Sequence, residues 1–494
     1  MALREGGRSS PFPQSVSRFH AHGREGPGAQ GGKTGQYGAC RAILMPKMRR
    51  KRHAWSSERL VLYGYFLGLI LVGTALLSLP LSWSGFGGRA SVPVVDAFFT
   101  AVSAACVTGL ITIDTSLWSP AGQWIILALI QTGGLGIVTF GMLYLVLPRV
   151  RISLKSSKYL RESFVTEQMP RARQMIGSIV GTTFLIEAAG AVLLSAAFFR
   201  AGTARPVMDG AFHAVSAFCN AGFSLFSEGL VPFRGNVLVN FTVMGLVVFG
   251  GIGFMVIRDV RRKLSDWRRP LLFHTRLMLV ATPLFILVGF LGYLALDSGR
   301  LFRSMPTGEG IMAALFQSII PRTAGFNTID QADLSVPSRW LTLVLMFIGG
   351  GSGSTAGGIK VSTAFILIIA LFRGVDEKGD VQLFRRRISA NDVGRAAMFF
   401  LKAASLLGAS ILVLALLELP RGADPGQVVF ECVSALGTVG LSMGLTGALS
   451  TGGKLVVAAT MFAGRVGLFS LVIRTARDRA EALIDYPRGE VLIG

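Results

Sequence analysis

The chain has 494 residues, of which 51% are hydrophobic and only 15% are charged. Soluble proteins carry roughly a quarter charged residues, so this composition excludes an ordinary soluble domain and favours a membrane protein. The formal net charge of +22 would also suit a nucleic-acid binder. However, the basic residues lie in the N-terminal tail and in a few loops between apolar segments, which is a topology signal and argues against nucleic acid.

The chain begins with a tail over residues 1–55 that is rich in Gly, Ser and Arg and has no hydrophobic periodicity. This composition predicts a disordered basic segment, and the tail lacks the apolar core of a signal peptide. Met45 or Met48 would also serve as a start, because Met48 opens the basic run before the first apolar segment.

Eight apolar segments follow, and each is long enough to cross a hydrocarbon core of roughly 30 Å as a helix. They lie at about residues 59–80, 121–148, 174–199, 235–257, 277–297, 339–372, 396–419 and 453–474. Shorter apolar stretches lie between them at about 94–106, 208–219, 310–320 and 426–436. Because these are too short to span, we expect half-helices that enter the membrane and return. The predicted fold class is an all-α integral membrane protein with four span–pore-helix–span repeats around one central pore.

The repeats divide the chain after its tail. We expect pore repeat 1 at 56–150, repeat 2 at 151–260, repeat 3 with a gating loop at 261–375, repeat 4 at 376–480 and a C-terminal tail at 481–494. Seven Lys or Arg lie between Arg149 and Arg173, seven between Arg258 and Arg276, and six between Arg373 and Arg395. The positive-inside rule makes these loops and both termini cytoplasmic, so the half-helices enter from the outside.

The ends of the four half-helices share one pattern: small residues, then Gly, then Leu or Phe. Thirteen residues separate Asp96 from Gly109 and Asp209 from Gly222, with Phe, Ala-Val-Ser and Cys in register. The third copy has its Phe one position closer to Gly325, which leaves its register open. A Gly at one helix end is usually a C-cap, but four matched copies indicate a repeated functional loop.

Four such loops would supply what a dehydrated K⁺ needs, which is several oxygens in place of its water. Gly permits the positive φ that turns carbonyls inward, and the half-helices direct their electronegative C-terminal ends toward a cation. The predicted selectivity filter, with K⁺ at its backbone carbonyls, comprises Val107, Thr108, Gly109, Asn220, Ala221, Gly222, Thr323, Ala324, Gly325, Thr438, Val439 and Gly440.

These loops, with the runs Gly349–Lys360 and Gly464–Gly467, make residues 59–494 resemble the Trk/Ktr/HKT superfamily of potassium transporters. The chain looks most like a bacterial Ktr-type membrane subunit, because residues 1–55 are hydrophilic where Trk-type subunits have two extra spans. Gly109 stands where sodium-selective plant relatives have Ser, so the resemblance favours K⁺. A Trk-type or Na⁺-conducting member is the alternative.

The resemblance implies further properties that composition does not show. It implies a multi-pass protein of the bacterial inner (plasma) membrane, in contact with membrane lipid, that forms a homodimer on a cytoplasmic ring of RCK-type nucleotide-binding subunits. ATP and ADP would bind that partner ring, and Na⁺ would be an activator. The tail 481–494 would contribute to the dimer contact.

The glycine run within span 339–372 matches the spacing of a dinucleotide-binding fingerprint. It lacks the preceding strand and the βαβ unit, so we reject this interpretation. A P-loop is excluded because Ile359 separates Gly358 from Lys360. A broken helix remains, and we favour a gating loop beneath the filter over a passive kink. Its hydroxyls would serve backbone groups that leave the helix. The predicted gate comprises Gly349, Gly350, Gly351, Ser352, Gly353, Ser354, Thr355, Ala356, Gly357, Gly358 and Arg465.

Charged residues within the spans are costly and usually functional. Arg465 would be either a structural ion pair or a pore-facing cation beside the loop, and the family pattern favours the second. Arg322 would repel K⁺ if it faced the filter, so we expect it to point away and pair with a carboxylate, with Glu431 as a candidate. Glu187 is expected to be a buried hydrogen-bonding partner.

A polytopic membrane enzyme, such as a lipid-modifying transferase, is the rival class. It would need titratable groups that converge near one interface, and apart from Glu187 the spans offer few carboxylates and no His cluster. Cys40, Cys106, Cys219 and Cys432 form no CxxC pair, which argues against a metal or disulfide framework. We therefore expect transport rather than catalysis.

Overall fold

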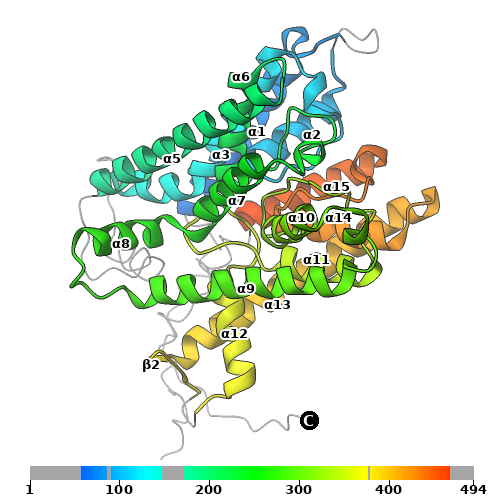
Figure 1. Cartoon of the computed structure of the whole chain (residues 1–494). Coiled ribbons are helices and arrows are strands. Elements are labelled where there is room, and N and C mark those ends of the chain that lie inside the picture. The colour runs from blue at the N-terminus through cyan, green and yellow to red at the C-terminus, as the bar shows by residue number, and fades with distance from the viewer. Residues whose placement is uncertain (1–56, 86–90, 147–171, 377–378, 468–494) are drawn as a thin grey trace, which may run out of the picture. The chain divides into compact units, whose positions relative to one another are not determined.

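The computed structural model describes residues 57–85, 91–146, 172–376 and 379–467 (Figure 1). The tails predicted at 1–55 and 481–494 lie outside the described residues. Most of the basic loop 149–173 also lies outside them.

Helices follow one order four times: a long helix, a short helix, and then either one further helix or two helices separated by a break. Repeat 1 holds α1 (Ser57–Leu77), α2 (Val94–Ala105) and α3 (Pro120–Val146). Repeat 2 holds α5 (Ala172–Arg200), α6 (Pro206–Phe218), α7 (Val237–Ile252) and α8 (Phe254–Ser265). Repeat 3 holds α9 (Phe273–Asp297), α10 (Thr307–Ile319), α11 (Val336–Phe347) and α12 (Val361–Arg373). Repeat 4 holds α13 (Ala390–Glu418), α14 (Pro425–Gly437) and α15 (Thr451–Phe462).

Short elements connect these helices. A two-stranded antiparallel hairpin of β1 (Val381–Leu383) and β2 (Arg386–Ile388) joins α12 to α13. Single 3₁₀ turns lie at Pro80–Ser82, Thr115–Leu117, Val231–Phe233, Phe302–Ser304, Leu419–Arg421 and Thr446–Ala448, and a π turn, Ala463–Gly467, follows α15. Side-chain caps start the fourth-repeat helices, since Ser389, Asp424 and Ser450 each accept a backbone N–H of the following turn.

Four described helical segments are long and apolar enough to cross a membrane, namely Leu60–Leu77, Gly177–Arg200, Phe273–Asp297 and Ala390–Arg421. The bent pair α7 and α8 would count as a fifth. The prediction of one continuous span at 235–257 is wrong, because the chain turns by 100° between α7 and α8. Span 339–372 is broken into α11 and α12, as its glycine run predicts.

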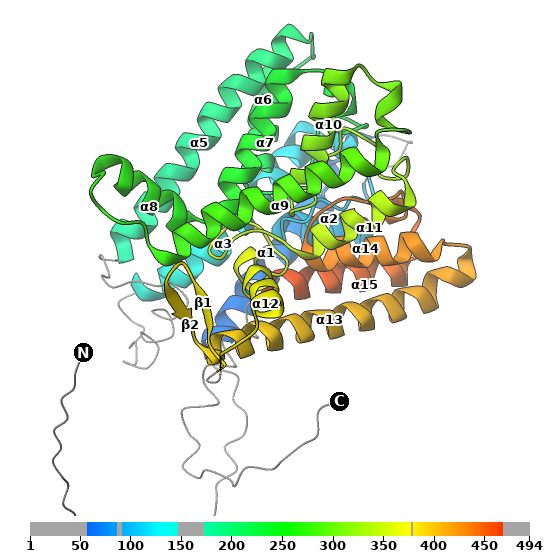
Figure 2. The same ribbon diagram turned by 60° about the horizontal axis from the view of Figure 1, so that its bottom comes forward.

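Neighbouring repeats touch in cyclic order. α3 packs on α5 and α6, α7 on α10, α11 on α14, and α15 returns to α2. Figure 2 shows α13, α14 and α15 as one group, with α12 beside α13. Each short helix buries one Phe almost completely at the position that the sequence repeat predicts, namely Phe99, Phe212, Phe316 and Phe430. Phe316 and Phe430 belong to one hydrophobic cluster, whereas Phe99 and Phe212 belong to two others.

Candidate functional site

The segment after each short helix has an unusual and repeated backbone. The first and third residues of each segment have positive φ: Val107 (57°) and Gly109 (92°), Asn220 (58°) and Gly222 (72°), Thr323 (76°) and Gly325 (73°), and Thr438 (51°) and Gly440 (96°). Six non-glycine residues of the described chain have positive φ, and four of them are these. Such backbone is strained in non-glycine residues and persists only where the surroundings impose it.

The four glycines form a closed ring, as a hypothetical Cβ on each one reveals. A Cβ on Gly222 would lie 2.7 Å from the carbonyl oxygen of Ala324 and 2.7 Å from the Cα of Gly325. The other three would also overlap the next segment: Gly109 with the carbonyl of Ala221, Gly325 with that of Val439, and Gly440 with that of Thr108. The four segments therefore surround one axis in chain order, and their spacing excludes any side chain at these positions.

Backbone hydrogen bonds fix each segment to its short helix. Thr108, Ala221 and Val439 donate to the carbonyl five residues earlier, at 2.8, 2.7 and 2.8 Å. Ala324 instead donates to the carbonyl of Ile320, four residues earlier, at 3.0 Å. The third turn is therefore one residue shorter, which explains why its Phe lies one position closer to the glycine. The register left open by the sequence is thus settled by a tighter turn.

A cavity of about 270 Å³ lies against this ring and is lined by all four glycines. Its wall also contains Asn327, the exposed carboxylate residue Asp330 and Gln331. Asp330 thus places a carboxylate at this cavity, which favours a cation there.

On the opposite side of the ring lies the glycine-rich segment between α11 and α12. Its neck is closed by two backbone hydrogen bonds, from Gly349 to Ile359 (2.8 Å) and from Val361 to Gly350 (3.0 Å). Within it, the Ser354 hydroxyl donates to the Gly351 carbonyl at 2.7 Å. A Cβ on Gly357 would overlap the side chain of Thr438. The segment therefore contacts the first residue of the segment that follows the fourth short helix.

The tip of this segment is held at the break between α7 and α8. Gly351 donates to the carbonyl of Gly251 at 2.7 Å, and the N–H of Phe254 donates to the carbonyl of Gly353 at 3.1 Å. Gly253, with a φ of 104°, lies between these two contacts. The backbone groups that the break removes from the helix ladder are thus satisfied by the loop, which accounts for the bend that the sequence did not predict.

Thr355 is fully buried, and both its hydroxyl and its carbonyl form hydrogen bonds to other parts of the chain. Its hydroxyl lies 2.9 Å from the side-chain amide of Asn220 and donates to a carbonyl of Phe218 (3.1 Å) or Gly250 (3.0 Å). Its own carbonyl accepts a hydrogen bond from Arg465. The loop is therefore tied to the segment after the second short helix on one side and to a buried cation on the other.

Arg465 lies in the π turn after α15 and is 3% exposed. Besides Thr355, its guanidinium donates to the carbonyl of Gly133 in α3 at 3.2 Å. It thus bridges repeat 1 and the loop.

Lys360 donates to the carbonyl of Ala356 at 2.7 Å and is a second cation at the loop. Lys360 lies outside the predicted gate residues, although a lysine within an apolar segment signals such a role.

Two other predictions about charged residues had different outcomes. Arg322 does point away from the ring, but its pairing with Glu431 is wrong: Arg322 donates to the carbonyl of Thr282 in α9 at 3.3 Å. Glu431 instead accepts hydrogen bonds from the hydroxyls of Ser442 and Thr446. Glu187 is buried and accepts from Gln131 at 3.1 Å, which confirms its predicted role as a hydrogen-bonding partner.

The remaining predicted loop residues have structural contacts of their own. The Ser352 hydroxyl pairs with that of Ser362 at 3.0 Å rather than with a backbone group. Gly358 has a φ of 65°, so the neck requires glycine there.

Within the described residues, no three His, Cys, Asp or Glu side chains gather as metal ligands would.

A mostly helical chain with several long apolar helices and a ring of converging glycine loops is a multi-pass membrane transport protein in its architecture. The chain belongs to the TrkH family of cation transport proteins, whose family model matches residues 76–482. The family comprises transporters, so the protein is not an enzyme.

Curated relatives cover nearly the whole chain. The potassium/sodium uptake protein NtpJ of Enterococcus hirae is 39% identical over 91% of this chain and 100% of its own length. The Ktr system potassium uptake protein B of Vibrio alginolyticus is 37% identical over 92% of this chain and 98% of its own length. The solved structure of the potassium transporter TrkH from Vibrio parahaemolyticus matches with a TM-score of 0.66 over 87% of both chains at 22% identity, which shows the shared fold.

Proposed function

We propose that this protein is the ion-translocating subunit of a potassium uptake system, with eight membrane-spanning segments and the half-helices α2, α6, α10 and α14 between them. The observation that carries the proposal is the closed ring of Gly109, Gly222, Gly325 and Gly440. Four backbone segments that meet around one axis offer the carbonyl oxygens that replace the water of K⁺. The twelve predicted filter residues are those of this ring and the two positions before each glycine.

The loop Gly349–Gly358 and Arg465 form the gate in this proposal. The loop lies beneath the ring, against Asn220 and Thr438, where it would obstruct an ion leaving the filter. Arg465 holds the loop through the Thr355 carbonyl and places a positive charge at the same depth. Both effects oppose the passage of K⁺, and withdrawal of the loop would remove them together.

The membrane orientation of the proposal has support in packing. Val256 of α8 shares one hydrophobic cluster with Val381, Leu383 and Ile388 of the hairpin. The basic connections 258–276 and 373–395 therefore lie on the same side, which the positive-inside rule makes cytoplasmic. Both termini would lie on that side of a bacterial plasma membrane.

The partners in this proposal are a second copy of the chain and a cytoplasmic RCK-type ring that binds ATP and ADP. Na⁺ would act as an activator of this assembly. The names of the relatives above, a Ktr system protein and a potassium/sodium uptake protein, are consistent with such a system. Binding of the ring to the purified chain, with ATP or ADP present, would be measured by size-exclusion chromatography.

Na⁺ conduction is the second candidate, because one relative is named for both potassium and sodium uptake. Proteoliposomes that contain the purified chain separate the two. We expect uptake of K⁺ to exceed uptake of Na⁺ at equal concentrations. Equal rates, or faster Na⁺ uptake, would favour the second candidate, and no cation uptake above that of empty liposomes would contradict the channel-like mechanism.

A further inference from the structure

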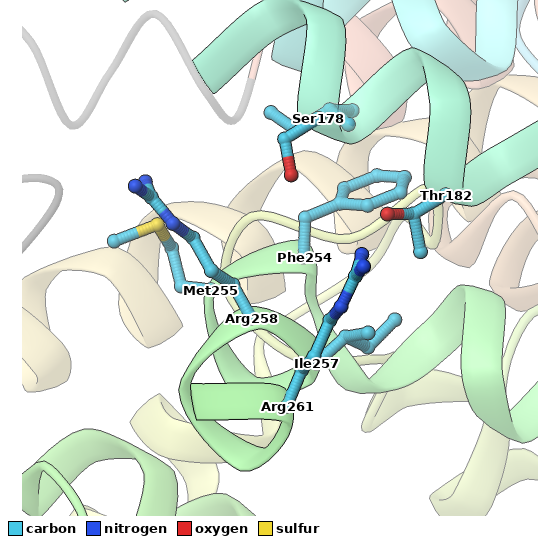
Figure 3. A pocket seen from close by; sticks show the side chains of 8 residues that line it. Ser178, Thr182, Phe254, Met255, Ile257, Arg258 and Arg261 are labelled. Carbon is cyan, nitrogen blue, oxygen red and sulfur yellow. The ribbon is translucent and has the colours of Figure 1, made fainter. Parts of the chain in front are cut away.

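A small cavity of about 30 Å³ lies where α8 meets the beginning of α5 (Figure 3). Ser178 and Thr182 line it from α5, and Arg258 and Arg261 line it from α8. Figure 3 shows the Arg261 side chain extending from α8 toward Thr182. A buried water needs about 10–15 Å³ of such space, so the cavity admits a few polar oxygens and not a bulky ligand.

The two arginines of this cavity have no counter-charge among the described residues. Neither guanidinium forms an ion pair or hydrogen bond there, although Asp259 lies on the same helix and Asp266 directly follows it. Asp259 accepts a backbone N–H of the α8–α9 connection at 2.9 Å, and Asp266 pairs with Arg269 at 3.0 Å. The cavity therefore presents two free guanidiniums and two hydroxyls, which is the chemistry of a phosphate site.

The position of α8 indicates where such a phosphate would come from. Because α8 turns by 100° from α7, it runs along the membrane surface if α7 crosses the membrane. Leu264 and Trp267, at the end of α8, are 71% and 75% exposed. A basic helix with exposed Leu and Trp is typical of the membrane interface. The cytoplasmic leaflet, which we assign to this side, carries the anionic lipids.

We propose that the α5–α8 cavity binds the phosphate of an anionic phospholipid of the cytoplasmic leaflet, held by Arg258 and Arg261 and by the hydroxyls of Ser178 and Thr182. The inference rests on the membrane placement in the proposed function and not on ion selectivity. Phe254, which also lines the cavity, donates its N–H to Gly353. The bound lipid would thus contact Phe254, the same residue whose backbone N–H holds the loop at Gly353.

Lipid binding tests the proposal without any transport assay. The purified full-length chain is titrated with phosphatidylglycerol or phosphatidylcholine, and the bound lipid is counted by native mass spectrometry. We expect tighter binding of phosphatidylglycerol. The variant Arg258→Gln/Arg261→Gln should weaken it at least about tenfold, because it removes the charge-assisted hydrogen bonds of both guanidiniums to the phosphate. Arg261→Lys, which keeps the charge but loses the two-pronged donor, should give an intermediate loss.

The matched control is Arg262→Gln/Lys263→Gln, which removes the same charge from the same helix outside the cavity. It should change phosphatidylglycerol affinity less than twofold. Equal losses in both double variants would reduce the effect to general charge attraction and overturn the site. Full displacement of the lipid by millimolar inorganic phosphate would assign the cavity to a free anion. Unchanged lipid binding in the cavity variant, with loss of nucleotide control by the partner ring, would make α8 a protein contact instead.

These outcomes are separate from the proposed function. Failure of K⁺ uptake with intact, cavity-dependent lipid binding would contradict the transport mechanism alone. Normal K⁺ uptake with no preference for phosphatidylglycerol would contradict the lipid site alone.

Discussion

Three of the four residues that open the filter segments, Val107, Thr323 and Thr438, are β-branched and nevertheless have positive φ. A non-glycine residue held in this region costs of order 1–3 kcal/mol. Such strain persists because the preceding helix and the neighbouring segments determine the backbone on both sides. In the proposed function, these segments would therefore hold their conformation before an ion arrives, which is what discrimination between two ions of equal charge requires.

Gly109→Ser should weaken discrimination of K⁺ from Na⁺. A Cβ there overlaps the carbonyl of Ala221, and a φ of 92° is strained for serine, so the carbonyls must turn. A strain of about 1–3 kcal/mol changes an equilibrium constant by roughly 5- to 150-fold. We therefore expect the K⁺/Na⁺ flux ratio in proteoliposomes to fall by at least about fivefold. Gly447→Ser is the control, because Gly447 lines the same cavity with no atom within 4 Å of its Cβ position. An unchanged ratio in Gly109→Ser would remove Gly109 from the filter.

Arg465→Ala should raise K⁺ flux several-fold, since it removes both the positive charge and the hydrogen bond that holds the Thr355 carbonyl. Arg465→Lys keeps a charge at that depth but not the two-carbonyl bridge to Gly133 and Thr355. Its flux should lie between those of Arg465→Ala and the unmodified protein. The K⁺ fluxes of the three proteins would be compared in the presence of the partner ring and ADP. Lower flux in a folded Arg465→Ala variant would argue that Arg465 supports conduction.

At the scale of elements, the loop Gly349–Gly358, which is our proposed gate, and the α7–α8 bend depend on each other. The loop has no helix of its own, and its tip is held by backbone groups that the bend releases. An element with few internal contacts has low local stability, as a moving part requires. Straightening α7 and α8 into one helix would consume those same groups and release the loop.

Deletion of residues 351–356 should raise K⁺ flux and make it insensitive to nucleotide on the partner ring. The deletion removes the contacts to Gly251, Phe254 and Arg465 but leaves the neck at Gly349 and Ile359. Flux would be compared in ATP and in ADP, after the retention of native size is verified. A folded deletion variant with low and fully regulated flux would place the gate elsewhere.

Gly253→Ala should also raise flux, by a separate route. Its Cβ would lie 2.7 Å from the Ser352 carbonyl, and a φ of 104° disfavours alanine, so the loop must shift or the bend must open. Gly245→Ala in α7 is the matched control, because nothing lies within 4 Å of its Cβ position and alanine favours a helix. Equal flux in the two variants would show that the bend does not control the loop.

The sequence predicted the features that recur in all four repeats. It did not predict features that depend on a single contact between distant parts of the chain. The four half-helices begin and end within about three residues of their predicted bounds, because the Phe and Gly positions recur in each. The break at Gly253 lies in an apolar run that looks continuous, since its cause is the loop about 100 residues later in the chain. Likewise, the partner of Arg322 is a backbone carbonyl in α9, and carbonyls leave no signature in a sequence.

At the scale of the whole molecule, the orientation is open to direct measurement. Arg262→Cys should be labelled by an impermeant thiol reagent only from the cytoplasmic side, and Arg303→Cys only from the outside, since both residues are exposed. Cys106, Cys219 and Cys432 are buried and give little background, and Cys40 would be replaced by Ser. Labelling of Arg262→Cys from the outside would reverse the proposed topology.

The ring of four glycines, our proposed filter, is assembled from one polypeptide. In a pore built from four identical subunits, one codon change alters all four sides at once. Here a change at Gly109, Gly222, Gly325 or Gly440 alters a single quarter of the ring, and the shorter third turn already shows that the quarters differ. If the proposed filter is this ring, its ion preference would change one quadrant at a time.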